Sequence, residues 1–199
     1  QLSFPSMRSQ GHRYRDVSAF MQMTLLRLAE SSPAALFTGI DRLLARIGKS
    51  RGIKLRRALN QIRNRIPQED LKLENLVEIL SQKKGKILIF STFRKTAEYL
   101  AARLSARFRR RPKVAWLSGQ LSETKRLEVL RRFSPRAQGY ASETGDIDIL
   151  CSTDAISEGL DIQDAATLIN YDLHWTPLRL VQRLGRLDRP TVEERRVSA

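Results

Sequence analysis

The chain has 199 residues, of which 41% are hydrophobic, and its formal net charge is +15. Its single cysteine excludes a disulfide framework, and this cysteine together with two histidines makes a poor ligand set for structural zinc. No apolar run is long enough to span a membrane and no signal peptide is recognisable, so a cytoplasmic protein without a membrane partner is expected. The charge favours nucleic acid as a polyanionic partner, and a merely basic solvated surface is the plain alternative.

Residues 1–82 read as a basic helical segment. Apolar residues at helical spacing predict helices over residues 14–30, 33–47, 54–65 and 70–82. Ser32 is a predicted N-cap, Pro33 occupies the first helical position, and Gly48 is predicted to end the second helix.

The stretch "RIGKSRG" (46–52) contains the Gly-Lys-Ser of a phosphate-binding P-loop. The full pattern needs a glycine where Leu43 stands, and it needs a strand before the loop rather than a helix. The stretch is therefore interpreted as a helix C-cap. Without a P-loop, this chain alone is not expected to hydrolyse a nucleoside triphosphate.

In residues 83–199 the sequence pattern changes and predicts strands that alternate with helices. Apolar runs predict strands over 86–91, 113–118, 146–152 and 166–172. Helices are predicted over 94–108, after a Ser122 cap, briefly after the third strand, and over the stretch that follows the fourth. This rhythm predicts an α/β fold in which helices cover both faces of a parallel sheet.

Small polar residues stand where the predicted strands end. They are Ser91-Thr92, Ser118-Gly119, Ser152-Thr153 and Asp172. The carboxyl ends of parallel strands form one edge, where ligands bind in open α/β sheets, and such residues suit contacts to phosphates. Helix capping is the alternative role for each serine or threonine.

The last predicted helix is rich in arginine. Arg179, Gln182, Arg183, Arg186 and Arg189 share one side of a helical wheel, and Leu180, Val181, Leu184 and Leu187 lie opposite. Gly185 is predicted to interrupt the helix and to permit a close backbone approach. Guanidinium groups suit phosphate recognition, whereas an amphipathic surface helix with solvated arginines is the alternative.

Three stretches carry a family resemblance. "QRLGRLDR" (182–189) resembles motif VI of superfamily 2 helicases and translocases, "STDAISEGLDI" (152–162) resembles motif V, and "ILIFSTF" (87–93) resembles motif IV. "NYDLHWTPLRLVQRLGRLDR" is most similar to the SWI/SNF-type branch and its bacterial relatives. The resemblance implies that residues 83–199 form the second, RecA-like lobe of an ATP-dependent motor.

The resemblance also implies roles for individual residues. Arg186 and Arg189 would be arginine fingers directed at the γ-phosphate of ATP, Gln182 would sense that phosphate, and Gly159 and Asp161 would lie beside the nucleotide. The nucleic-acid backbone would be held by a further set of residues: Ser91, Thr92, Ser118, Gly119, Thr153 and Trp175. Arg179 and Arg183 receive no role, and surface charge is their simplest interpretation.

A first RecA-like lobe of the same full-length protein would bind most of the ATP and its magnesium, so the fragment alone is expected to be inactive. The motor is expected to move along a nucleic acid, with DNA favoured over RNA. A bacterial protein of this kind would be nucleoid-associated. Two other classes stay open: a RecA-like nucleic-acid-binding module without ATP chemistry, and a protein-interaction lobe.

Overall fold

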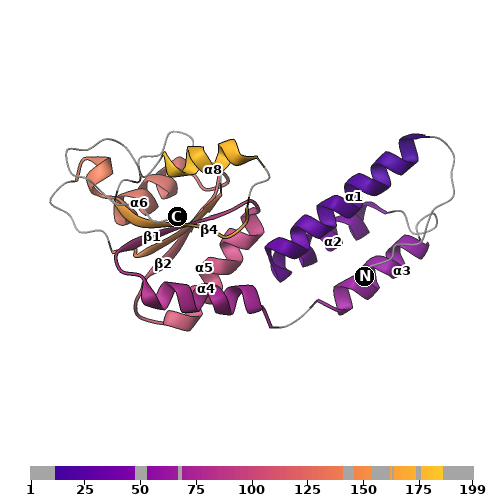
Figure 1. Ribbon diagram of the computed structural model, residues 1–199, viewed down its shortest axis with the longest axis horizontal. Coiled ribbons are helices and arrows are strands. Elements are labelled where there is room, and N and C mark those ends of the chain that lie inside the picture. The colour runs from indigo at the N-terminus through magenta and orange to yellow at the C-terminus, as the bar shows by residue number, and fades with distance from the viewer. Residues whose placement is uncertain are drawn as a thin grey trace. The chain divides into compact units, whose positions relative to one another are not determined.

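The computed structural model (Figure 1) describes residues 12–47, 53–66, 69–140, 146–153, 162, 164–173 and 176–185. Contacts divide the chain into two compact units, Gln1–Asp70 and Leu71–Ala199, named here the helical unit and the α/β lobe. The predicted C-cap at Gly48 and the predicted short helix after the third strand lie outside the described residues.

The helical unit contains α1 (His12–Ser31), α2 (Pro33–Arg46) and α3 (Ile53–Asn64), each matching a predicted helix. Ser32 is the N-cap of α2, as predicted, because its hydroxyl accepts a hydrogen bond from the Ala35 amide at 3.1 Å. The apolar stripes of the three helices meet in a small core of Leu25, Leu36, Ile40 and Leu59.

The α/β lobe is built on a parallel sheet of four strands. They are β1 (Lys86–Ser91), β2 (Val114–Leu117), β3 (Ile149–Thr153) and β4 (Ala165–Asn170), in the order β2-β3-β1-β4. All four strands were predicted, with ends that differ by up to three residues. The central strand β1 is buried from Ile87 to Ser91, as expected of an apolar strand covered on both faces.

Helices cover both faces of this sheet (Figure 1). Ile87 and Ile89 of β1 pack in one core with α4 (Leu71–Gln82) and α5 (Arg94–Phe108). Leu88 and Phe90 point to the other face, where α6 (Glu123–Phe133) and α8 (Pro177–Leu184) lie. Alternate residues of one strand thus supply two cores, and the predicted α/β class is confirmed.

Helix α4 belongs to the α/β lobe, whereas the sequence pattern assigned it to the helical segment that ends at residue 82. Its leucines Leu73, Leu76 and Leu80 are buried in the same core as Ile87. Gly85, at a φ of +83°, turns the chain from α4 into β1. The boundary between the two units falls between Asp70 and Leu71 in the chain. The sequence pattern placed it later because helical spacing does not reveal which core the leucines of a helix enter.

Candidate functional site at the carboxyl edge of the sheet

The carboxyl ends of the strands bring the predicted polar residues to one edge of the lobe. Ser91 and Thr153 end neighbouring strands and are register partners. Ser118 directly follows β2, and Asp172 lies two residues after β4. The sequence thus correctly predicted which residues lie at this edge, because parallel strands align their carboxyl ends.

Asp172 is the centre of a hydrogen-bond cluster at this edge. Its Oδ2 accepts a bond from the Ser91 hydroxyl at 2.6 Å and from the Thr92 amide at 3.0 Å. Its Oδ1 accepts a bond from Lys72 Nζ at 3.1 Å, and the Lys72 ammonium also lies 4.0 Å from the centre of the Tyr171 ring. Both carboxylate oxygens are therefore engaged in a side chain that is largely buried.

Burial separates the predicted nucleic-acid contacts into two groups. Ser91, Ser118 and Thr153 are buried, and the Ser118 hydroxyl accepts a bond from the Gln120 amide. Thr92 and Gly119 are exposed, and a Cβ added at Gly119 would meet no atom within 4 Å. Of the predicted contacts that the structure describes, Thr92 and Gly119 therefore face solvent, while Ser91 and Ser118 organise the turns behind them.

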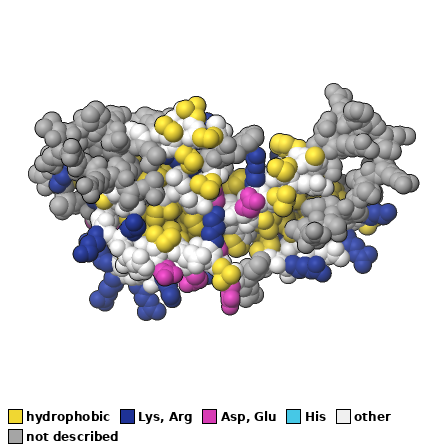
Figure 2. Space-filling view, viewed as in Figure 1, with side chains coloured by type: hydrophobic (Ala, Val, Ile, Leu, Met, Phe, Trp, Pro, Cys, Tyr) yellow, Lys and Arg dark blue, Asp and Glu magenta, His cyan; other side chains and the backbone are white. Residues whose placement is uncertain are grey.

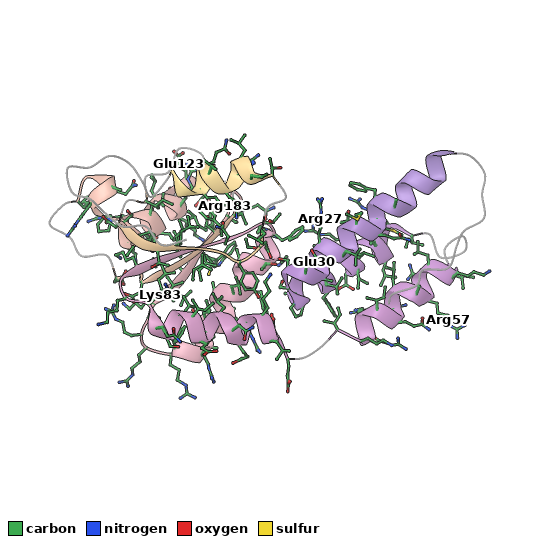
Figure 3. The ribbon with its side chains drawn as sticks, in the orientation of Figure 1. Arg27, Glu30, Arg57, Lys83, Glu123 and Arg183 are labelled. Atoms are coloured by element: carbon green, nitrogen blue, oxygen red, sulfur yellow. The ribbon has the colours of Figure 1, made fainter. Side chains whose placement is uncertain are left out.

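Among the described residues, Arg183 is the largest completely buried side chain, with 1% of its surface exposed. Its Nη1 donates to Asn170 Oδ1 at 2.6 Å and to the Asp172 carbonyl oxygen at 3.4 Å. Its guanidinium lies 5.0 Å from the centre of the Phe90 ring. Figure 3 labels Arg183 where α8 overlies the sheet. The expectation that Arg183 is surface charge is wrong.

Helix α8 shows the predicted amphipathic arrangement only in part. Arg179 and Gln182 are exposed as predicted, but Val181 is exposed and Arg183 is buried. Leu178 and Val181 are 62% and 63% exposed, whereas Arg183 is directed at the sheet. The physical reason is that the edge under α8 presents polar acceptors, Asn170 and the Asp172 carbonyl, rather than an apolar core. Gln182 is exposed on this helix.

Helix α8 ends at Leu184, and Gly185 is its C-cap. Its φ is −61°, and its amide donates to the Val181 carbonyl at 2.9 Å. The described helix thus stops at the predicted position, and residues 186–190 lie outside the described part of the chain. Neither the backbone angle nor the hydrogen bonding requires glycine there. The nearest atom to an added Cβ is the Val181 carbonyl oxygen at 3.6 Å.

Five predicted site residues lie outside the described residues: Gly159, Asp161, Trp175, Arg186 and Arg189. Three residues of the edge cluster were missed by the sequence reasoning, namely Lys72, Asn170 and Arg183. Asn170 stands close before Asp172 at the end of β4, so its place in the strand was an available signal. Lys72 had no such signal, because it precedes Asp172 by 100 residues.

The opposite, amino edge of the sheet carries basic side chains that pair within the fold. Figure 2 also shows Lys and Arg side chains with acidic side chains among them along the lower part of the α/β lobe, where Figure 1 places α4 and α5. A cavity of about 250 Å³ there is lined in part by Arg109, Lys113 and Arg132. Asp146 accepts bonds from Arg132 Nε at 2.8 Å and Lys113 Nζ at 2.9 Å, and these two cations lower the pKa of its carboxyl. The basic side chains at this edge are explained by ion pairs within the fold and by the stabilising effect of cations at helix C-termini.

A membrane-spanning helix and a metal site are both absent from the described residues. No helix there is long and apolar enough to cross a membrane. No group of three or more histidine, cysteine or acidic side chains in that part of the chain has an arrangement that would hold a metal ion.

Comparison with known proteins assigns a family. A model of the helicase conserved C-terminal domain matches residues 71–191. An ATP-dependent helicase of Bacillus subtilis named YqhH is 28% identical over 88% of this chain and 29% of its own length. DEAD-box ATP-dependent RNA helicase 24 of Arabidopsis thaliana is 31% identical over 66% of this chain and 16% of its own length. The chain therefore spans less than a third of either relative.

Solved structures agree on the fold. The Hef helicase domain of Pyrococcus furiosus matches with a TM-score of 0.54 at 23% identity, covering 88% of this chain and 39% of that one. The C-terminal part of the Fun30 ATPase domain matches with a TM-score of 0.53 at 22% identity, covering 73% and 46%. The predicted RecA-like fold is thereby confirmed. With its parallel sheet, its polar carboxyl edge and a family match that begins at α4, this chain belongs to the helicase conserved C-terminal domain family.

Proposed function

We propose that this chain is the second motor lobe of an ATP-dependent helicase or translocase, acting with a first RecA-like lobe of a longer protein. The family match over residues 71–191 carries this proposal. The exposed Thr92 and Gly119 at the carboxyl edge support it, because ligands bind outside that edge in open α/β sheets.

The proposed ATP chemistry needs both lobes. In this chain, Arg186 and Arg189 would stabilise the charge that develops on the transferred phosphoryl group, and Gln182 would sense the γ-phosphate. Gly159 and Asp161 would lie beside the nucleotide, while the first lobe would supply the P-loop and the magnesium ligands. Because the fingers and the P-loop stand on different lobes, hydrolysis would depend on lobe closure.

The proposed track is the sugar-phosphate backbone of a nucleic acid. Thr92 and Gly119 are the proposed direct contacts at the edge, and Ser91, Ser118 and Thr153 would hold the turns that present them. Trp175 would contact the nucleic acid or couple it to the ATP site. The relatives' names include RNA helicases and a putative DNA helicase, so the proposal covers both nucleic acids and the wider superfamily rather than the SWI/SNF-type branch alone.

The finger assignment is tested in the full-length protein. Arg186→Ala is expected to lower ATP turnover by about 10³- to 10⁵-fold while a fluorescent ATP analogue still binds with a similar Kd. Arg179→Ala is the matched control, since Arg179 is an exposed arginine of α8 with no proposed role. Turnover in Arg186→Ala at the level of the control would refute the assignment, and turnover by the 199-residue chain alone would refute the need for a first lobe.

The nucleic-acid contact is tested by placing a negative charge at the edge. Thr92→Asp is expected to weaken binding of single-stranded DNA and RNA and to reduce the salt dependence of their Kd, because the new carboxylate repels phosphate. Ser81→Asp is the control, since Ser81 is exposed near the end of α4 away from this edge. Equal binding by both variants would refute the edge as the track. Binding without ATP turnover in the intact full-length protein would favour the non-catalytic module instead.

A further inference from the structure

The connection between α5 and β2 carries a dense run of positive charge at the amino end of an edge strand of the sheet. The end of α6 adds a further cation beside it. The Asp148 amide donates to the Lys113 carbonyl at 2.9 Å, and the Ile147 amide donates to the Arg132 carbonyl at 3.2 Å, so the two segments meet at the start of β3. The exposed cations of these segments are named here the basic corner: Arg107, Arg109, Arg110, Arg111, Lys113 and Arg132.

The fold holds this connection in place on both sides of the basic run. Phe108 and Val114 pack against the core that α5 shares with β1. Between them, the Asp148 carboxylate accepts a bond from the Lys113 amide at 2.7 Å and from Arg111 Nη1 at 3.1 Å. Because the backbone is already ordered, the side chains of the basic corner can bind a ligand without the entropy cost of ordering a loop.

Ion pairs neutralise part of the charge of the basic corner. Arg107, Arg109 and Arg110 are exposed and form no ion pair among the described residues. The helix dipole stabilises cations at the C-terminus of α5, but it leaves their charge in contact with solvent. The corner therefore presents more positive charge than the fold itself uses. Its ion pairs are Arg111–Asp148 at 3.1 Å, Lys113–Asp146 at 2.9 Å, Arg132–Asp146 at 2.8 Å and Arg132–Glu128 at 3.8 Å.

The cavity of about 250 Å³ at the amino edge lies within the basic corner. Its lining combines Arg109, Lys113 and Arg132 with the apolar side chains Val114 of β2 and Val129 of α6. The volume is below the roughly 300–1,000 Å³ of sites that enclose a whole drug-sized ligand. The cavity therefore suits one group of a longer ligand, such as a phosphate or a base.

The composition of the basic corner favours phosphates over a protein partner. Guanidinium groups bind phosphate oxygens in a bidentate manner. Protein interfaces centre on aromatic and apolar side chains, whereas the large exposed hydrophobic side chains of the described chain lie outside residues 107–113. A nucleic-acid duplex repeats its charge about every 3.4 Å along each strand, so neighbouring arginines can each take a phosphate.

The basic corner lies at the opposite end of the sheet from Thr92 and Gly119. Lys113 precedes β2 and Ser118 follows it, so about 17 Å of extended chain separates the two edges. Helices cover both faces of the sheet between these edges (Figure 1). A nucleic acid that lies along the carboxyl edge does not reach the corner unless it turns round the lobe.

We propose that the basic corner binds the sugar-phosphate backbone of a second nucleic-acid segment, separate from the one at the carboxyl edge. The second segment is another molecule or a distant part of the same one. Binding at the corner requires neither ATP nor a particular base sequence, so it goes beyond the proposed motor function. Such a contact would keep the protein on nucleic acid while the contact at the carboxyl edge is broken.

The first test measures the Kd of the full-length protein for a short DNA duplex over a range of salt concentrations. Arg109→Ala combined with Arg110→Ala is expected to weaken binding for every DNA sequence. It should also lower the slope of log Kd against log salt by about 2, because each arginine contacts about one phosphate. Arg109→Lys combined with Arg110→Lys retains both charges and should keep most of the slope.

The matched control removes the same charge from a different part of the chain. Arg42 and Arg46 are exposed arginines of α2 in the helical unit, so Arg42→Ala combined with Arg46→Ala changes the net charge equally. Its salt slope should stay close to that of the unmodified protein. Equal slopes for the corner variant and this control would mean that net charge alone decides binding, and the inference would be overturned.

The second test asks whether two nucleic-acid segments are held at once. Single-stranded oligonucleotides that carry a donor or an acceptor dye are mixed with the full-length protein, and energy transfer between them is measured. The unmodified protein should give transfer, and Arg109→Ala combined with Arg110→Ala should remove most of it. A polyglutamate peptide of equal charge should compete poorly with the oligonucleotides, because carboxylates do not reproduce the spacing of phosphates along a strand.

Failure of this inference is distinguishable from failure of the proposed function. Unchanged energy transfer in the corner variant, or displacement by polyglutamate as effective as displacement by DNA, overturns the inference. If Thr92→Asp leaves binding intact while the corner variant weakens it, the proposed track at the carboxyl edge fails and the inference stands. If Thr92→Asp weakens binding and the corner variant does not, the track stands and the corner is ordinary solvated charge.

Discussion

Replacing Arg183 by methionine should destabilise the α/β lobe although the sequence pattern treats Arg183 as surface charge. Methionine keeps most of the aliphatic volume but removes the bonds donated to Asn170 at 2.6 Å and to the Asp172 carbonyl at 3.4 Å. Hydrogen bonds that involve a charged group contribute about 1.5–3 kcal/mol each, so their loss costs about 4 kcal/mol. Methionine also removes the need to desolvate a guanidinium, which offsets about half of that loss. The expected net loss is about 2 kcal/mol.

Urea unfolding of the chain, followed by tryptophan fluorescence, measures this difference. Both tryptophans of the chain, Trp116 and Trp175, belong to the α/β lobe, so the signal reports on that unit. With a slope of about 2 kcal/mol per molar urea, Arg183→Met should lower the midpoint by about 1 M. Arg179→Met, an exposed arginine of the same helix, should stay within about 0.5 kcal/mol of the unmodified chain. Equal midpoints for the two variants would refute the buried placement of Arg183.

Three further predictions follow from other contacts of the lobe. Gly85→Ala should lower the free energy of unfolding by about 1–2 kcal/mol because φ is +83° there. Gly185→Ala, at a φ of −61°, should raise it by about 0.5 kcal/mol. Urea midpoints that shift in the same direction in both variants would refute the assigned backbone angles. Cys151 is buried and its pKa is raised to about 12, so a thiol reagent at pH 8 should label it only at the rate of unfolding, and rapid labelling of the folded chain would contradict that burial. Hydrogen bonds from Arg132, the larger cause, and from Lys113 lower the pKa of Asp146, so its carboxylate stabilises the fold above the unfolded pKa of about 4 and this contribution is lost as the pH falls below it. Asp146→Asn should therefore cost about 1 kcal/mol at pH 7 and less at pH 3, after allowance for solvent screening at this exposed site, and a cost independent of pH would oppose the assignment.

The contrast between Arg183 and Arg179 also bears on how arginine-rich motifs are interpreted. Both residues lie on α8 and differ by four positions, so a helical wheel places them on the same side. Arg183 lies over Phe90 and reaches the end of β4, whereas Arg179 is exposed. The wheel identifies a common side of the helix, but it does not tell whether that side faces water or a polar edge of the sheet.

The sequence by itself determined the elements of this protein and their order. Alternation of apolar runs and helical stripes is a local property, so it predicted all four strands, their parallel arrangement and the cap at Ser32. It also placed Ser91, Ser118, Thr153 and Asp172 at one edge, because that follows from parallel strands alone.

Only the tertiary structure decided which polar groups are buried, which helix joins which core, and which partners meet. The core that receives the leucines of α4, the burial of Ser91 and Arg183, and the bond from Lys72 to Asp172 all depend on contacts between residues far apart in the chain. Periodicity records the direction of a side chain relative to its own helix or strand. What that side chain meets is set by packing, and at this edge packing placed a buried arginine where a surface charge was expected.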